Sequence, residues 1–307
     1  MQTVLITGGT GLVGKQLTKM LLAKGYEVII MSREKKVSQQ QNVSYAVWNV
    51  EQQSIDINAI AQADYVVHLA GAGVVEKRWN DKRKQEIIES RTKSSALIVK
   101  ALKENANKVK AVVSSSAIGW YGPDPSTHVN GFEEVDEAHD DFLGETCKLW
   151  EESIEPVTQL GKRLVKLRTG IVLSKDGGAL KEFMLPIKFG IAAILGSGKQ
   201  MVSWIHIDDL CNIFISSIEN GNLQGSYNAV APNPVSNKEL TLSLATIMRG
   251  KFFIPIHVPS FVLKIMMGEM SIEVLKSTTV SCHKIKTAGY KFMYPAVDDA
   301  LKQLLAK

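Results

Sequence analysis

The feature that most constrains this chain is a glycine-rich stretch near its start, residues 7–14, which reads TGGTGLVG. The apolar run Val4–Ile6 before it is typical of a buried parallel strand, and leucines at helical spacing after it predict a helix. Glycines at such a junction let the chain turn tightly, so that backbone N–H groups meet a pyrophosphate at the positive helix end. We therefore predict a dinucleotide-binding turn. The residues expected to contact the dinucleotide are Gly8, Thr10, Gly11, Leu12, Val13 and Gly14.

Length, charge and cysteine content argue against several classes of protein. A chain of 307 residues can bury one large or two ordinary domains, and no apolar run approaches the roughly 18–20 residues of a membrane span. The start leads directly into the first strand, which predicts no signal peptide, and three scattered cysteines suit a reducing cytoplasm without a metal site. The net charge of +5 comes without a basic stripe interleaved with aromatic residues. We expect a cytoplasmic protein with no metal, membrane or nucleic-acid partner.

The end of the second strand indicates which dinucleotide is bound. After the strand Glu27–Met31 come Ser32 and Arg33, where a NAD-binding protein usually carries an acid for the ribose 2′-hydroxyl. A hydroxyl and a planar guanidinium instead suit a 2′-phosphate. Glu34 follows at once and leaves NAD as the alternative. The sequence favours NADP(H) as the cofactor.

The remaining pattern alternates strands and helices, as in a doubly wound sheet. Further strands are expected at 43–48, 64–69, 110–113, 163–173 and 226–229, and further helices at 81–105, 142–161 and 237–248. We predict an α/β, Rossmann-type doubly wound parallel sheet with a smaller C-terminal α+β lobe on the substrate side. Residues 1–175 would form the NADP-binding domain, to which 206–231 return, and 176–307 would form the smaller domain.

Three details outside this regular pattern are also predicted. Residues 203–210 pass from strand to helix, with Asp208 or Asp209 as the N-cap. The apolar segment 255–268 is interrupted by proline and polar residues, so we expect it to pack in the core or between the lobes. The stretch 124–141, rich in acids, proline and glycine, is expected to be a mobile loop over the site.

Small and polar residues follow two central strands, at the sheet edge where open α/β folds bind ligands. The run Leu69–Gly73 would let a ligand lie against the backbone, and serines 114–116 stand where nicotinamide and substrate meet in such folds. The candidates from these two strand ends are Leu69, Ala70, Gly71, Ser114 and Ser116.

Motifs spread over essentially the whole chain resemble one family. They are the runs 167–173 (LRTGIVL), 177–180 (GGAL), 184–186 (MLP), 196–198 (GSG) and 203–209 (SWIHIDD), with 78–80 (RWN), 90–91 (SR) and 147–151 (CKLWE). Together they are similar to an atypical group of extended short-chain dehydrogenase/reductases, the epimerase family or sugar nucleotide epimerase-like proteins, which carry a C-terminal domain of unknown function. The resemblance implies an NADP(H) site lined by Ser32, Arg33, Leu69, Ala70, Glu86, Arg91 and Val172.

One departure concerns the superfamily's catalytic motif Tyr-x-x-x-Lys, which occurs nowhere in this chain. By resemblance, the tyrosine would transfer a proton and the lysine would lower the tyrosine pKa. Lys148 stands at the lysine position, but Gly144 stands where the tyrosine belongs. We expect bulk such as Trp120, Tyr121 or Cys147 to fill the space of that tyrosine. Candidates for another acid–base group are Tyr121, Glu145, Cys147 and His206.

Two functions are open at this point. The first is an NADP(H)-dependent oxidoreductase or epimerase acting on a small hydroxy or carbonyl compound, with a nucleotide sugar as one candidate; its predicted catalytic residues are Ser116, Lys148 and Tyr121. The second, favoured by the missing tyrosine, is a non-catalytic NADPH-binding sensor or scaffold. A homodimer is a candidate assembly. A flat pocket for a ring substrate could be formed by Trp79, Trp120 and Trp204.

Overall fold

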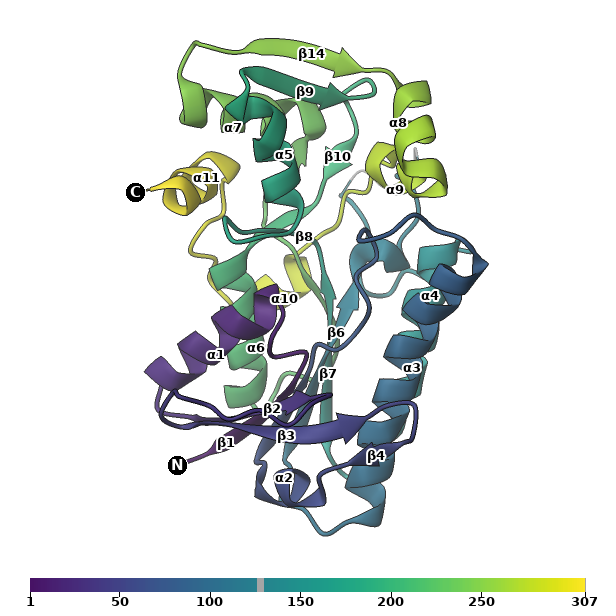
Figure 1. Ribbon diagram of the computed structural model, residues 1–307, viewed down its shortest axis with the longest axis vertical. Coiled ribbons are helices and arrows are strands. Elements are labelled where there is room, and N and C mark those ends of the chain that lie inside the picture. The colour runs from purple at the N-terminus through teal and green to yellow at the C-terminus, as the bar shows by residue number, and fades with distance from the viewer. Residues whose placement is uncertain (126–129, 307) are drawn as a thin grey trace.

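The computed structural model describes residues 1–125 and 130–306, and its largest element is an eight-stranded sheet with helices on both faces (Figure 1). The strand order is β12-β7-β6-β5-β1-β2-β3-β4, and neighbouring strands are parallel except β3 and β4. The order reverses between β1 and β5, so a ligand crevice is expected at their carboxyl ends. The strands of this sheet are β1 Thr3–Thr7, β2 Glu27–Ser32, β3 Val43–Asn49, β4 Ser54–Ile55, β5 Tyr65–His68, β6 Ala111–Ala117, β7 Arg163–Thr169 and β12 Gly225–Ala229.

Two hydrophobic cores lie on opposite faces of the sheet because strand side chains alternate in direction. In β1, Val4 and Ile6 join the core under α1 and α6, whereas Leu5 joins the core under α2 and α3. In Figure 1, α1 and α6 lie on one side of the sheet and α3 and α4 on the other. The helices of this part are α1 Leu12–Ala23, α2 Ile57–Gln62, α3 Asp81–Glu104, α4 Phe142–Ile154, α6 Ile207–Glu219 and α10 His283–Thr287, with the 3-10 helices η1 Ile118–Trp120 and η2 Glu155–Leu160.

A smaller lobe occupies the end of the molecule opposite the N-terminus (Figure 1). Its centre is β9, whose Ala192 and Ile194 are buried against α5 and α7. Strand pairs β9–β14 and β8–β11 are parallel, and β10–β13 is antiparallel. The elements here are β8 Ile171–Leu173, α5 Ala179–Lys188, β9 Ile191–Leu195, β10 Met201–Val202, β11 Trp204–His206, β13 Val235–Ser236, α7 Asn237–Arg249, β14 Ile254–Val258, α8 Ser260–Met267, η3 Gly268–Met270, α9 Ser271–Leu275 and α11 Val297–Leu305.

The predicted α/β doubly wound fold is confirmed, but two element boundaries are wrong. The strand expected at 163–173 is split at Gly170, and its second half, β8, leaves the main sheet to pair with β11. A Cβ at Gly170 would lie 2.6 Å from the carbonyl oxygen of Ser203, so the crossing requires glycine. The helix expected at 142–161 ends at Ile154 and continues as η2, which carries a proline in its first turn.

Two expectations for the smaller lobe and its junction are also wrong. The N-cap of α6 is His206, whose ring nitrogen Nδ1 accepts the N–H of Asp208 at 3.0 Å. Asp209 is instead buried and accepts N–H groups of the C-terminal segment. The segment 255–268 forms β14 and α8, which are largely exposed rather than packed in the core. Within the described chain, no helix is long and apolar enough to cross a membrane. The domain boundary at 175 stays a prediction.

Candidate functional site

Backbone contacts close the glycine turn between β1 and α1 at Gly8 and Gly14. Gly8 has a φ of +69°, and a Cβ there would lie 2.8 Å from the carbonyl carbon of Leu69. A Cβ at Gly14 would lie 2.5 Å from the carbonyl oxygen of Gly8. Gly11 is exposed and caps α1, so no capping side chain competes for the first N–H groups of the helix. The turn is thus a preformed anion site that fits a dinucleotide pyrophosphate.

A buried histidine, which the sequence did not single out, joins this turn to the end of β5. The Thr7 hydroxyl lies 2.7 Å from His68 Nδ1 and accepts the N–H groups of Leu69 and Ala70 at 3.2 and 3.3 Å. The hydroxyl therefore donates to His68, which places the ring proton on Nε2. Burial, with the charge of Arg91 beside it, lowers the pKa of His68 to about 3. The neutral ring fixes the backbone of the predicted Leu69–Gly71 contact region.

Of the predicted cofactor residues, Ser32 ends β2, the strand paired with β1, and Arg33 follows it. The Ser32 hydroxyl is buried and accepts the N–H of Glu34 at 3.3 Å, while the Arg33 side chain is exposed. On the other side of the turn, Val172 belongs to β8. A Cβ at Gly178 would lie 3.7 Å from the Val172 carbonyl oxygen and 3.3 Å from Leu12 of α1, so β8 borders the helix start.

Arg91 and Glu86, both on α3, occupy different environments. The Arg91 guanidinium lies under Gly71 and donates to the carbonyl oxygens of Ala72 and Ile87 at 3.0 and 2.9 Å. It therefore supports the backbone that follows β5. Glu86 has a half-exposed side chain and forms an ion pair with Arg83 at 2.7 Å. The sequence resemblance implied that Glu86 lines the cofactor site, and the structure pairs its carboxylate with Arg83.

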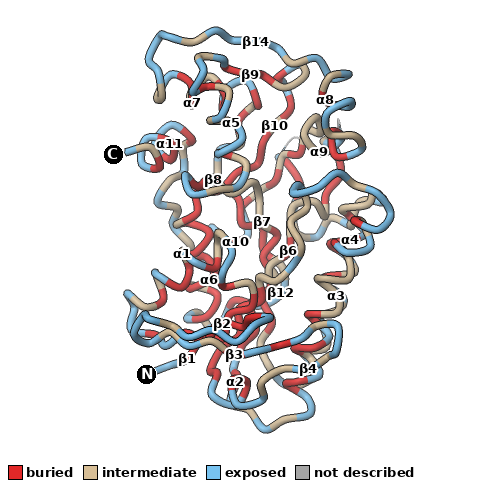
Figure 2. Tube along the Cα trace, viewed as in Figure 1, coloured by how far each residue is buried: buried red, intermediate tan, exposed pale blue. Residues whose placement is uncertain are grey.

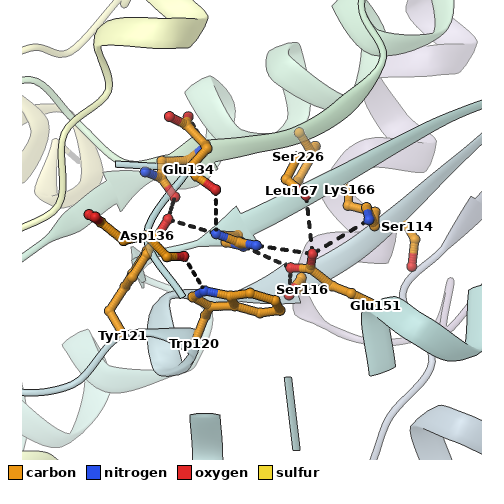
Figure 3. Close-up of polar contacts among 12 residues, drawn as sticks. Ser114, Ser116, Trp120, Tyr121, Glu134, Asp136, Glu151, Lys166, Leu167 and Ser226 are labelled. Atoms are coloured by element: carbon orange, nitrogen blue, oxygen red, sulfur yellow. Dashed lines mark hydrogen bonds and ion pairs between the residues drawn. The ribbon is translucent and has the colours of Figure 1, made fainter. Parts of the chain in front are cut away.

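Ser116, at the end of β6, belongs to a buried polar network between α4 and β7 (Figure 3). Its hydroxyl donates to Glu151 at 2.8 Å. The same carboxylate accepts Nε and Nη2 of Arg168 at 2.8 and 3.2 Å, and both residues are almost fully buried. Burial works against the charged form of Arg168, yet its hydrogen bonds with Glu151 hold its pKa above the ordinary value. Ser226 and Lys166 approach the carboxylate at 3.1 and 3.7 Å.

Arg168 also fixes two aromatic residues near the end of β6 (Figure 3). Its guanidinium carbon lies 3.6 Å from the ring centre of Trp120, and Nη1 donates to the Tyr121 hydroxyl at 3.0 Å. The Tyr121 hydroxyl in turn donates to Asn228 at 2.7 Å. Tyr121 is fully buried, and burial raises its pKa to about 12 although Arg168 opposes the shift. Its hydroxyl is thus held in the core by two partners.

Gly144, the position of the missing tyrosine, is closed by the chain that precedes α4. Its N–H donates to the N-cap Asp141 at 2.8 Å, and an added Cβ would overlap the carbonyl oxygen of His139. A bulky side chain such as Trp120 was expected to fill this space, but the His139 backbone occupies it instead. A side chain at Gly144 would require the start of α4 to move.

The exposed and buried faces of α4 separate Lys148 from Cys147. Lys148, predicted from the motif spacing, is exposed, as is Glu145. Cys147 is buried, and its sulfur lies 3.6 Å from where a Cβ on Gly119 would be. Burial raises the pKa of this thiol to about 12, although the charge of Arg91 opposes the shift. The structure therefore brings Cys147, not Lys148, to the turn that follows β6.

A second polar cluster, which sequence reasoning missed, joins the start of α4 to the smaller lobe. The Lys276 ammonium lies 2.9 Å from Glu273 and 3.4 Å from Asp141, and it donates to the Tyr121 carbonyl oxygen at 3.4 Å. His139 lies 3.1 Å from Asp141. Burial, reinforced by Asp141, raises the pKa of Glu273 although Lys276 opposes the shift. The only local signal was the i,i+3 spacing of Glu273 and Lys276.

The acidic stretch 124–141 is anchored at both of its described ends. Asp124 accepts the N–H of Thr279 at 2.6 Å and the hydroxyl of Ser277 at 2.7 Å, and the Phe132 N–H donates to the Thr279 carbonyl oxygen at 2.8 Å. The expectation of a mobile loop also covers residues 126–129, which lie outside the described residues.

The remaining candidates lie apart from this site. Trp79 packs edge-on against Phe142 at 4.8 Å, and Trp204 is fully buried and donates to the Asn233 carbonyl oxygen. The three tryptophans therefore do not form one flat pocket. His206 is fully buried at the start of α6. Over the residues that the structure describes, no group of three or more His, Cys, Asp and Glu could hold a metal ion.

The switch in strand order beside a glycine turn, with serines at the end of the next strand, defines a Rossmann-type protein of the short-chain dehydrogenase/reductase class. Residues 4–141 match the NAD dependent epimerase/dehydratase family, and residues 258–304 match a domain of unknown function, DUF1731. Epimerase family protein YfhF of Bacillus subtilis is 33% identical over 99% of this chain and 98% of its own. Epimerase family protein SH2119 of Staphylococcus haemolyticus is 34% identical over 99% of each chain. The chain therefore belongs to the epimerase family proteins, which confirms the resemblance seen in the sequence.

Solved structures agree with this assignment. The human epimerase family protein SDR39U1, crystallised with NADPH, has a TM-score of 0.86 and 28% identity over 99% of both chains. The nucleoside-diphosphate sugar epimerase from Corynebacterium glutamicum has a TM-score of 0.76 and 31% identity, over 99% of this chain and 58% of its own.

The first prediction concerns the glycine turn. Gly11→Val should abolish NADPH binding in calorimetry, because the valine side chain would stand where the backbone meets the pyrophosphate. Gly11 is exposed and its φ of −75° suits valine, and an added Cβ would lie 3.3 Å from the Gly8 carbonyl oxygen, so the protein should fold with a small loss of stability. Gly14→Val is the contrasting variant, since its Cβ would meet backbone at 2.5 Å. It should lower the melting temperature by roughly 5 °C or more. Retained NADPH binding in Gly11→Val would remove the pyrophosphate assignment.

The second prediction concerns the closed tyrosine position. Gly144→Ala should lower the free energy of unfolding by roughly 1–3 kcal/mol, because the added methyl overlaps backbone. Gly144→Tyr should be less stable still and should gain no turnover. Lys148→Ala, an exposed change on the same helix, should leave urea unfolding unchanged. A stable Gly144→Tyr variant with new activity would show that one side chain separates this protein from ordinary relatives.

Proposed function

We propose that this protein binds NADP(H) and catalyses an oxidoreduction or epimerisation of a small hydroxy or carbonyl compound, with nucleotide sugars as the first class to test. The observation that carries this proposal is the glycine turn, in which backbone contacts close Gly8 and Gly14 while Gly11 is exposed at the start of α1. The human relative crystallised with NADPH supports the choice of cofactor.

NADP(H) is proposed over NAD because the end of β2 offers Ser32 and Arg33 rather than an acid. The exposed Arg33 side chain is free to reach a 2′-phosphate, and the buried Ser32 hydroxyl lies beside it. Arg91 would act indirectly, by holding the backbone at Gly71 and Ala72 against the dinucleotide.

The chemistry would be divided between the cofactor and the polar groups at the ends of β6 and α4. The nicotinamide, when bound, supplies or accepts hydride. Ser116 donates its hydrogen to Glu151, so its oxygen presents lone pairs that can accept a hydrogen bond from a substrate hydroxyl. For proton transfer we propose Glu273, with Lys276 holding its carboxylate at the start of α4. Lys148, from the motif spacing, and Tyr121, as a candidate to replace the missing tyrosine, stay predictions.

A non-catalytic NADPH sensor is the second candidate function. Two observations favour it: the Tyr121 hydroxyl is fully engaged by Arg168 and Asn228, and Gly144 leaves no space for a catalytic tyrosine. Turnover separates the two functions, because a sensor binds NADPH without oxidising it. A cytoplasmic location and a homodimer stay predictions from the sequence.

The third prediction tests the cofactor assignment. Arg33→Ala should weaken NADPH binding roughly ten- to a hundredfold, because a charge-assisted phosphate contact is lost. NADH binding should barely change, since NADH has no 2′-phosphate. Isothermal titration calorimetry with both cofactors makes the comparison. Equal weakening of both would show that Arg33 does not read the phosphate.

The fourth prediction tests the proton-transfer group by NADPH oxidation with a panel of carbonyl compounds and nucleotide sugars. Glu273→Gln and Lys276→Met should each lower kcat by roughly tenfold or more and leave the Kd for NADPH unchanged. Lys148→Met is the matched control for loss of a lysine. A loss of turnover in Lys148→Met alone would assign the role to Lys148 instead. Binding of NADPH without turnover on the whole panel would favour the sensor.

A further inference from the structure

At the end of the molecule opposite the N-terminus, the smaller lobe presents two phenylalanines on adjacent turns. Phe189 follows α5 and Phe252 precedes β14, and their side chains are 79% and 80% exposed. Arg249 joins the two turns, because Nη1 donates to the Lys188 carbonyl oxygen and Nε to the Phe252 carbonyl oxygen, both at 3.0 Å. We call these four residues, together with the exposed Lys251, the aromatic tip.

The aromatic tip continues into an uncovered sheet face. The register of β9 and β14 pairs Ile191 with Ile254, and alternation places both on the same face as Ile256. Ile254 and Ile256 are 66% and 44% exposed, whereas Ala192 and Ile194 on the opposite face are buried. Figure 2 shows β14 and α8 as exposed along this end of the molecule. No other part of the described smaller lobe covers these isoleucine side chains fully.

The two segments that form this face, 183–207 and 240–268, carry cations and no acids. Glu182, Glu239 and Glu269 lie directly beyond their ends. At the far end of β14, α8 adds the exposed apolar side chains of Phe261, Ile265 and Met266. The cations in these two segments are Lys188, Lys199, Arg249, Lys251 and Lys264.

The free edge of β14 argues against strand pairing with a second copy. Within the described residues, β9 is the one strand paired with β14. The Ile254 N–H donates to the Gly190 carbonyl oxygen at 2.8 Å, so the next residue, Pro255, is directed to the free edge and offers no N–H. Exposed aromatic and aliphatic side chains with cations beside them match a negatively charged lipid interface.

We propose that the aromatic tip and the adjoining face of β14 dock on an anionic membrane surface. Phe189 and Phe252 insert between lipid headgroups, and Lys188 and Lys251 contact their phosphates. Such docking needs no membrane-spanning helix, so the proposal revises the sequence prediction of no membrane partner. The glycine turn lies in the other lobe and stays open to the cofactor.

Sedimentation with lipid vesicles tests the proposal on the full chain. The protein should co-sediment with vesicles of phosphatidylglycerol and phosphatidylcholine, bind pure phosphatidylcholine much less, and be released by salt. Phe189→Ser with Phe252→Ser, and separately Lys188→Glu with Lys251→Glu, should each lower the partition coefficient about tenfold or more. Arg249 is left intact because it holds the two turns.

Lys100→Glu with Lys103→Glu, exposed lysines on α3, is the matched charge control and should bind vesicles as the parent does. Melting curves and NADPH binding establish that each variant is folded. Absence of binding to phosphatidylglycerol vesicles, or equal loss in the α3 control, would overturn the proposal. So would a dimer in analytical ultracentrifugation that the two phenylalanine changes dissociate, because the face would then be covered by a second copy.

Discussion

The buried ion pair of Glu151 and Arg168 is the interaction on which the candidate site depends, because it joins α4 to the central strands of the sheet. Taking both charges out of water is costly, and hydrogen bonds from Ser116 and Ser226 to the carboxylate offset part of that cost. Loss of either partner would leave an uncompensated buried charge, which typically costs roughly 3–5 kcal/mol. The same pair therefore fixes the Ser116 hydroxyl and the Tyr121 ring.

The cofactor half of the site depends on a different constraint, the contact of backbones at Gly8 and Gly14. The two halves are linked through neighbouring strands, since His68 at the end of β5 is in register with Ser114 on β6. His68 is buried and neutral, so it positions the Thr7 hydroxyl without adding charge beside the dinucleotide. The tightly closed glycine turn thus adjoins a buried network that depends on the charges of Glu151 and Arg168.

Patterns of neighbouring residues in the sequence predicted the features that depend only on short segments of chain. The glycine turn, the strands beside it and α3 follow from turn chemistry and periodicity, and the fold class follows from their order. The sequence could not show that Cys147 faces the core and Lys148 faces solvent, because only packing shows which face of α4 is buried. The contact of Lys276 with Asp141 joins segments 135 residues apart and has no local signature. The exposed face of β14 was mistaken for core because apolar composition does not indicate what covers it.

The missing tyrosine is part of a wider rearrangement rather than one substitution. At the start of α4, Asp141 both caps the Gly144 N–H and accepts from Lys276 of the smaller lobe. The segment that closes the Gly144 position therefore also joins the main sheet domain to the smaller lobe. The group proposed for proton transfer belongs to the same contact, because Glu273 pairs with Lys276 at 2.9 Å and burial raises the pKa of its carboxyl. The two proposed functions make different demands on the Glu273 carboxyl, because an enzyme would need it to exchange a proton with substrate and a sensor would not.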